Sequence, residues 1–409
     1  MGETAETKRL VYHLGGYDPV APQEAYRRFV RELRRFERTW SVAAFVSEPN
    51  IEPDIASWRV VASGPNWRVE TEYRLVRWDD VIAAAALRPM WRRIPLALLA
   101  FLDFVQAGAL WGYLRSNWRY AAFFLYPFVL FGVLAVLAWL VAGLAARTAG
   151  SSLIGAGAGL GAFVLLIQWP AKRLYLPLLF DDWIFSRDYI RRGHSVLDPR
   201  LERVACELAA RGRRGGADEI LVTGHSLGAV LAVDLLDRAL RLQPDLGEVR
   251  PRIAFASIGS SLLKIGLHRG ATRFRAGVAG VASASQIFWA EYQALTDVMN
   301  FYKTNPVAAM GLPSSGRPVV RVVRIRRMVQ PARYRRIRRN FFKVHCQFVN
   351  GNDRRAAYDY FMLLCGPLSV ERQVGYADGA ISAIGFDGAL LERTKDASSI
   401  LEAPVKASC

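Results

Sequence analysis

One serine in this chain lies in a pattern typical of a covalent catalyst. It belongs to the segment EILVTGHSLGAVLAVDLL, residues 219–236. The pattern is G-x-S-x-G and consists of Gly224, His225, Ser226, Leu227 and Gly228. An apolar, β-prone run precedes it, and residues 229–240 repeat apolar side chains at helical spacing, which predicts a strand, a tight turn and a helix. That order is typical of a nucleophile elbow, so we predict that Ser226 is a nucleophile; the alternative is a structural turn in another α/β protein.

A serine that attacks an acyl group also needs N–H groups that hold the developing oxyanion. The residue after the nucleophile, Leu227, supplies one of them at the start of the expected helix. The second has to come from another loop, and residues 10–20, LVYHLGGYDPV, are typical of a strand that ends in two glycines before a helix. We assign the second donor to the backbone N–H of Gly16 or Tyr17, with a glycine turn of no catalytic role as the alternative.

The base that activates such a serine is expected to be a histidine later in the chain, because α/β hydrolases order their triads as Ser, acid, His. Two of the five histidines follow Ser226, namely His268 and His345. The acids between Ser226 and His268 lie on the expected elbow helix or just before the next strand, at its wrong end. His345 can use later acids, so we predict His345 as the base; the alternative is a core or surface histidine.

The orienting acid is then Asp297 or Glu291. Residues 252–259, 285–295 and 318–329 are each expected to form a strand of the core. Catalytic acids lie just beyond the carboxyl end of a strand, where the loops of the active-site face gather. Asp297 has that position, whereas Glu291 falls inside the expected strand. We predict Asp297, with Glu291 as the alternative acid and a helix-capping role as the alternative for Asp297.

Two long uncharged segments interrupt the chain before the elbow. Residues 121–146 are long enough to span a bilayer, and residues 151–169 follow after a very short loop. Alternate glycines in the second segment suit close helix packing, and Trp169 suits an interfacial anchor. We predict a transmembrane hairpin, with two buried core helices as the alternative.

An earlier apolar stretch, residues 94–114, contains Asp103 and Gln106, which are costly at the centre of a bilayer. We expect an interfacial or lid-like helix there, with a third span as the alternative. Positive charges flank the hairpin on both sides while its loop has only Arg147; they are Arg92, Arg93, Arg115, Arg119, Lys172 and Arg173. The positive-inside rule therefore places both ends of the hairpin, and the domain that it interrupts, on the cytoplasmic side.

The chain of 409 residues has a formal net charge of +18 and is 52% hydrophobic. We find no helix-turn-helix, zinc-finger or aromatic-basic RNA motif, so we predict no nucleic-acid partner. The excess charge concentrates in residues 317–343, and we expect an anionic-lipid contact through Arg333, Arg335, Arg336, Arg338 and Arg339. The four cysteines are scattered without a CxxC pair, which is typical of reduced cytosolic thiols rather than disulfides or a metal site.

GHSLGA after a strand, HLGGYDP near the start, and an aspartate and then a histidine downstream resemble a lipase/esterase-type α/β-hydrolase. The resemblance covers roughly residues 8–90 and 174–385 and implies a mainly parallel sheet flanked by helices, interrupted here by a helical transmembrane insertion. The expected parts are a first hydrolase segment, the membrane insertion, a second hydrolase segment with the elbow, and a weakly ordered polar tail: 1–90, 91–173, 174–385 and 386–409.

These observations predict a membrane-anchored serine hydrolase that cleaves a carboxylic ester, of lipid or another acylated compound, without a metal or cofactor. Two alternatives remain. An acyltransferase would use the same triad with an acceptor other than water. A catalytically inactive hydrolase-like scaffold would be favoured if Ser226, His345 and an acid did not converge in the folded chain.

Overall fold

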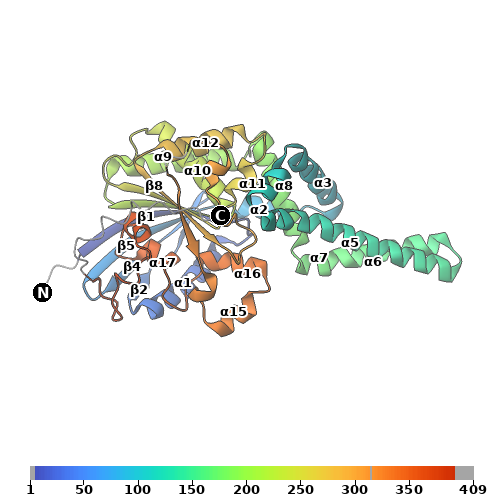
Figure 1. Ribbon diagram of the computed structural model, residues 1–409, viewed down its shortest axis with the longest axis horizontal. Coiled ribbons are helices and arrows are strands. Elements are labelled where there is room, and N and C mark those ends of the chain that lie inside the picture. Colours follow the sequence, from blue (N-terminus) through green and yellow to red (C-terminus); the bar gives the residue numbers. More distant parts are fainter. Residues whose placement is uncertain (1–4, 314–315, 392–409) are drawn as a thin grey trace, which may run out of the picture.

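The computed structural model describes residues 5–313 and 316–391, and its centre is a nine-stranded sheet (Figure 1). The strands are β1 Ala5–Leu14, β2 Ala43–Val46, β3 Asn50–Ile51, β4 Ile55–Gly64, β5 Trp67–Val76, β6 Glu219–His225, β7 Arg252–Ile258, β8 Ile287–Ala294 and β9 Val319–Val323. Their order is β2-β4-β5-β1-β6-β7-β8-β9, with β3 paired to β4. In this order, neighbouring strands from β5 through β1 to β9 pair in parallel. The strand β4 pairs in antiparallel fashion with each of its partners, β2, β3 and β5. The predicted mainly parallel α/β sheet is therefore confirmed.

Helices cover both faces of this sheet, which explains why its central strands are buried on both sides. Every residue of β6 is buried. Figure 1 shows α9, α10 and α12 on one face and α1 and α17 on the other. Their bounds are α1 Pro22–Trp40, α9 Leu197–Arg214, α10 Gly228–Leu242, α12 Thr272–Ser283 and α17 Tyr360–Cys365. At the centre, β1 pairs with β6, and the buried Arg9 and Glu219 side chains join the two strands at 2.8 Å.

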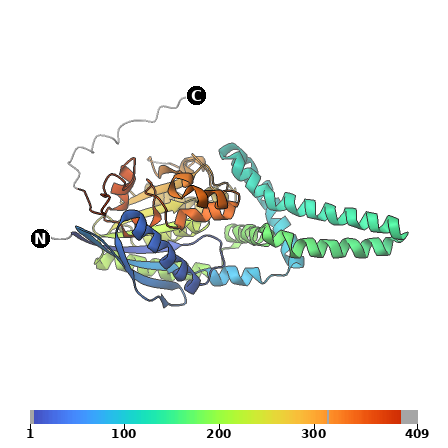
Figure 2. The same cartoon turned by 90° about the horizontal axis from the view of Figure 1, so that it is seen from below.

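The predicted hairpin is a pair of long apolar helices, α5 Trp118–Ala149 and α6 Ser152–Gln168, that projects from the body (Figures 1 and 2). Both are long and apolar enough to cross a membrane, the second when counted through Arg173. The helices approach closely where small residues meet, since a Cβ on Gly155 would lie 2.6 Å from the Cβ of Ala146. The chain thus carries the inserted apolar helical pair that its sequence predicts.

The earlier apolar stretch forms two helices, α3 Met90–Gln106 and α4 Ala109–Ser116, bent by 67° at their junction. Asp103 of α3 pairs with Arg191 at 2.5 Å and with Arg187 at 3.5 Å, both on α8 Leu176–Arg192. These ion pairs attach α3 to the body and provide the partners that Asp103 needs. Several apolar side chains of α3 stay exposed, namely Leu98, Leu99 and Leu102.

The first residues of the expected tail are packed against the edge of the sheet. The indole N–H of Trp67 donates to the carbonyl of Gly388 at 2.9 Å, and the Asn66 amide donates to the carbonyl of Leu390 at 2.8 Å. Residues 386–391 thus belong to the folded body, whereas residues 392–409 lie outside the described part of the chain. The expected strand at 318–329 is also shorter, because β9 ends at Val323 and a turn of helix follows.

Candidate active site

Ser226 occupies a sharp turn between β6 and α10. Its φ is +55°, a left-handed conformation that is rare for a residue with a side chain. The two glycines of the motif are required by close backbone contacts: a Cβ on Gly224 would lie 2.4 Å from the Cα of Ala229, and one on Gly228 would lie 2.1 Å from the carbonyl oxygen of Leu14. This strand, sharp turn and helix agree with the geometry expected of a nucleophile elbow.

Asp297 and His345 are brought together from distant parts of the chain. Asp297 lies three residues beyond the carboxyl end of β8, and His345 lies on the short helix α16, Phe341–Cys346. The His345 Nδ1 and Asp297 Oδ2 atoms are 2.7 Å apart, and the other carboxylate oxygen accepts the Met299 N–H at 2.9 Å. Both side chains are buried. The carboxylate therefore favours the tautomer with the proton on Nδ1, which leaves the Nε2 lone pair available as a base.

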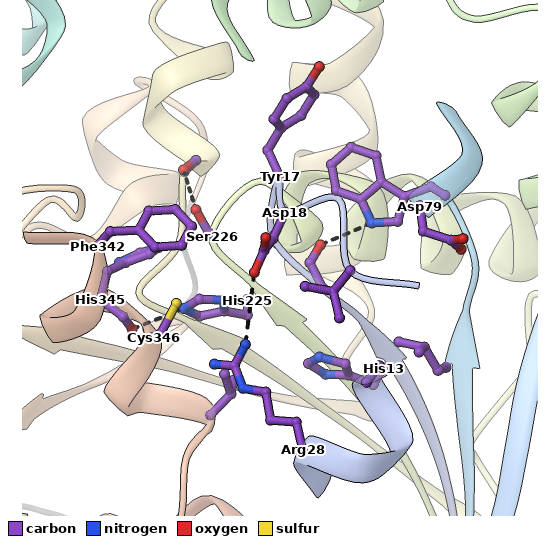
Figure 3. A pocket seen from close by; sticks show the side chains of 18 of the residues that line it. His13, Tyr17, Asp18, Arg28, Asp79, His225, Ser226, Phe342, His345 and Cys346 are labelled. Atoms are coloured by element: carbon purple, nitrogen blue, oxygen red, sulfur yellow. Dashed lines mark hydrogen bonds and ion pairs between the residues drawn. The ribbon is translucent and has the colours of Figure 1, made fainter. Parts of the chain in front are cut away.

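The Nε2 atom of His345 is buried and has no hydrogen-bond partner among the residues that the structure describes, and His345 lines the same cavity as Ser226 (Figure 3). In the structure the Ser226 hydroxyl instead lies 3.5 Å from the Ser261 hydroxyl. The serine–histidine hydrogen bond is therefore not made, although both groups face one cavity. A rotation about the Ser226 Cα–Cβ bond redirects the hydroxyl, and catalytic hydrogen bonds commonly tighten only when substrate binds.

Glu291, the alternative acid, has other partners. It lies within β8 and accepts hydrogen bonds from the hydroxyls of Ser257 and Ser260. Burial raises the pKa of Glu291 to about 7. The other downstream histidine, His268, pairs with Asp103 at 3.4 Å and does not line the cavity. Of the two acids, the geometry thus places Asp297 against His345.

The loop after β1 lies directly against the serine. A Cβ on Gly16 would be 3.1 Å from the Cβ of Ser226. Within the described chain, the backbone N–H groups of Gly16, Tyr17 and Leu227 have no hydrogen-bond acceptor. Both loops assigned to the oxyanion therefore lie beside Ser226, with N–H groups available for a ligand.

His225 packs against His345, the histidine that is paired with Asp297. The two imidazole rings are 4.5 Å apart, and the His225 Nε2 atom lies 3.2 Å from the carbonyl oxygen of His345. Burial lowers the pKa of His225 well below its usual value, so this ring is neutral and donates to that carbonyl. The sequence indicated only that His225 belongs to the elbow; its contact with α16 depends on tertiary packing.

The cavity has a volume of about 160 Å³ and an apolar wall that the sequence did not indicate. Tyr120 and Phe123, from the first turns of α5, form part of this wall. Other apolar lining residues are Val76, Leu179, Met299 and Phe342. Phe341 of α16 packs on Phe123 with ring centroids 5.7 Å apart, so the base of the hairpin contacts the helix that carries His345.

Cys346 also lines the cavity, but burial raises the pKa of its thiol, which disfavours a thiolate nucleophile. Among residues 5–313 and 316–391, no group of three or more His, Cys, Asp or Glu side chains is arranged to hold a metal ion.

Comparisons with protein-family models, curated proteins and solved structures found no match for this chain.

Proposed function

We propose that this protein is a membrane-anchored serine hydrolase of the α/β-hydrolase type that cleaves a carboxylic ester. One observation carries the proposal: the buried His345–Asp297 pair leaves the His345 Nε2 atom without a hydrogen-bond partner in the described chain, and His345 lines the same cavity as Ser226, which stands on a strained elbow. The left-handed backbone of Ser226, a buried histidine–carboxylate hydrogen bond and flanking free N–H groups together favour acyl transfer over a purely structural role.

In the proposed reaction, His345 Nε2 removes the Ser226 proton as Oγ attacks the ester carbonyl carbon. The N–H groups of Leu227 and of Gly16 or Tyr17 stabilise the oxyanion. The tetrahedral intermediate expels the alcohol, which takes the proton from His345, and leaves an acyl-serine. Water then attacks with His345 as base, and the carboxylic acid and the free serine are released. Asp297 stabilises the imidazolium in both halves.

The base of the hairpin has the residues of a membrane interface. Trp118 begins α5, Trp169 follows α6, and their side chains are 66% and 64% exposed. Arg119 lies over the first ring at 5.7 Å and Arg173 over the second at 4.5 Å. Indole rings and long cationic side chains favour the headgroup layer. We therefore propose that the hairpin is inserted up to these residues and that the hydrolase body lies at the cytoplasmic surface of the membrane.

A cationic surface lies beside this base. It is formed at and after α15 Pro331–Ile337 by four exposed arginines, Arg335, Arg336, Arg338 and Arg339, which we call the α15 basic face. None of the four forms an ion pair within the described chain. Arg333, which was expected to join them, instead pairs with Asp353 at 3.0 Å. We propose that the α15 basic face contacts anionic lipid headgroups.

Replacing these four arginines with glutamine is expected to remove a preference of the detergent-solubilised chain for mixed micelles of phosphatidylserine over phosphatidylcholine. Each arginine near an anionic surface contributes ~1 kcal/mol of binding free energy. The wild-type preference should therefore fall as the salt concentration rises from 50 to 500 mM, because salt screens exposed charges. Equilibrium binding titrations measure it. The control replaces Arg31, Arg34 and Arg38 of α1. A wild type without the preference, or equal losses in both variants, would contradict the assignment.

The proposed activity is tested by fluorophosphonate labelling of the detergent-solubilised chain, with the adduct located by mass spectrometry. We expect the adduct on Ser226 and its loss in Ser226→Ala and His345→Ala. Ser261→Ala is the matched control, because this neighbouring hydroxyl lies 3.5 Å from that of Ser226 and has no assigned role as nucleophile. An adduct that persists in Ser226→Ala, or a folded wild type that does not react with or without added lipid, refutes the proposal.

A further inference from the structure

Several charged side chains line the cavity without taking part in the proposed reaction, among them Arg28 and the carboxylates of Asp18 and Glu32. Arg28 of α1 has a side chain that is 27% exposed, and Figure 3 shows its guanidinium pointing towards Asp18. Asp18 lies two residues after Gly16, the residue that abuts Ser226. The short loop from Gly16 to Asp18 therefore contacts Ser226 at one end and the Arg28 guanidinium at the other.

Arg28 has few acceptors for its five N–H groups. Its Nε and Nη2 atoms share one acceptor, the Asn350 side-chain oxygen, at 3.2 and 3.1 Å. Its Nη1 atom lies 3.8 Å from Asp18, which is beyond hydrogen-bonding distance. The Cys346 thiol also contacts the guanidinium, and the carboxylates of Asp18 and Glu32, which line the cavity, interact with its charge.

The buried Arg9 shows how this chain satisfies a structural guanidinium. Its Nε atom pairs with Glu219 at 2.8 Å, and its Nη atoms donate to three backbone carbonyls at 2.8–3.1 Å. Within the described chain, the Arg28 guanidinium has no comparable set of hydrogen-bond acceptors, although it lines the cavity. Its free donors are therefore available to a ligand.

The nearest anion, Asp18, is a poor permanent partner. Burial raises the pKa of Asp18, which Arg28 only partly opposes, and the two side chains form a long ion pair of 3.8 Å without a hydrogen bond. A phosphate group offers three oxygens to a planar guanidinium and forms paired, charge-assisted hydrogen bonds. Such a group would replace Asp18 beside Arg28.

We propose that Arg28 forms an anion subsite of the cavity and that the substrate is an ester that also carries a phosphate group. The ester part of this inference rests on the proposed function. The phosphate lies at Arg28, the ester carbonyl lies at Ser226 and Gly16, and hydrocarbon contacts the wall formed by Phe123 and Leu179. The net charge of +18 attracts such a substrate to the protein.

The test measures binding rather than turnover, so that it stands apart from the test of hydrolysis. Calorimetric titration of the detergent-solubilised Ser226→Ala chain uses hexyl phosphate, hexanol and inorganic phosphate. We expect hexyl phosphate to bind most tightly, because it uses both Arg28 and the apolar wall. Equal binding of inorganic and hexyl phosphate would identify free phosphate as the ligand and overturn the substrate assignment.

Two variants in the same background should move the affinity in opposite directions. Arg28→Gln should weaken hexyl phosphate binding about tenfold or more, and Asp18→Asn should tighten it several-fold because the competing carboxylate is gone. Arg27→Gln is the matched control, since Arg27 is on the same helix and pairs with Glu24 at 3.8 Å, as Arg28 does with Asp18, while neither Arg27 nor Glu24 lines the cavity. Equal affinities of the Arg28 and Arg27 variants, or no gain in Asp18→Asn, would overturn the subsite.

Discussion

Replacement of Asp297 with asparagine is expected to lower kcat by about 10⁴-fold while the chain stays folded. Asp297 accepts at 2.7 Å from His345 Nδ1 and also accepts the Met299 N–H. An asparagine that keeps the Met299 contact turns its NH₂ group towards Nδ1. His345 must then carry its proton on Nε2, where it cannot accept a proton from Ser226. Hydrolysis of p-nitrophenyl butyrate measures the loss.

Glu291→Gln is the matched control for this substitution. Glu291 is a buried carboxyl group of the same region, but it binds Ser257 and Ser260 rather than the histidine. Glutamine mimics its protonated form, which burial already favours, so kcat should change by no more than a few-fold. If the Glu291 variant lost activity and the Asp297 variant kept it, the acid of the triad would have been assigned to the wrong residue.

Gly228→Ala is expected to destabilise the fold by more than about 3 kcal/mol. The added Cβ would lie 2.1 Å from the carbonyl oxygen of Leu14 and 2.4 Å from that of Gly15. Both atoms are backbone, so relief requires separating α10 from β1 and from the loop that carries Gly16. The site should be lost together with the stability. Chemical denaturation of the detergent-solubilised chain measures the change.

An alanine at an open glycine provides the comparison. Gly375 is the last residue of α18 Val370–Gly375; a Cβ added there would have no other atom within 4 Å, and its φ is not left-handed. Gly375→Ala should leave the stability unchanged or raise it by a few tenths of a kcal/mol. Equal stabilities of the Gly228 and Gly375 variants would show that the elbow tolerates a side chain and that the steric argument is wrong.

The parts of the fold that could be predicted are those that depend on local sequence patterns. The buried strand before Ser226 and the helix after it follow from the pattern of the hydrophobic residues, and the two long apolar helices follow from the length of the uncharged segments 121–146 and 151–169. Histidines are few, so elimination indicated His345, and the observed contact with Asp297 is consistent with that reasoning. The position of Glu291 inside the expected strand, rather than beyond its carboxyl end, likewise favoured Asp297 as the orienting acid.

The features that could not be predicted depend on contacts between distant segments. No local period indicates that Phe123 of the hairpin packs on Phe341, or that Arg28 faces the cavity of Ser226. Residues 386–391, FDGALL, were assigned to a polar tail although they are mainly apolar, and Trp67 and Asn66 donate hydrogen bonds to their carbonyls. Charge alone likewise suggested that Arg333 faces lipid, whereas Asp353 holds it.

The pairing of β1 with β6 determines the order in which this chain can assemble. Arg9 and Glu219 join strands that are 210 residues apart, and the whole hairpin lies between them. During synthesis, β1 to β5 and then both apolar helices leave the ribosome before β6 exists. Until then β1 has one open edge, which is a template for unwanted strand pairing. In the membrane-inserted form that we propose, the hairpin holds this unfinished edge at the membrane surface while the sheet is completed.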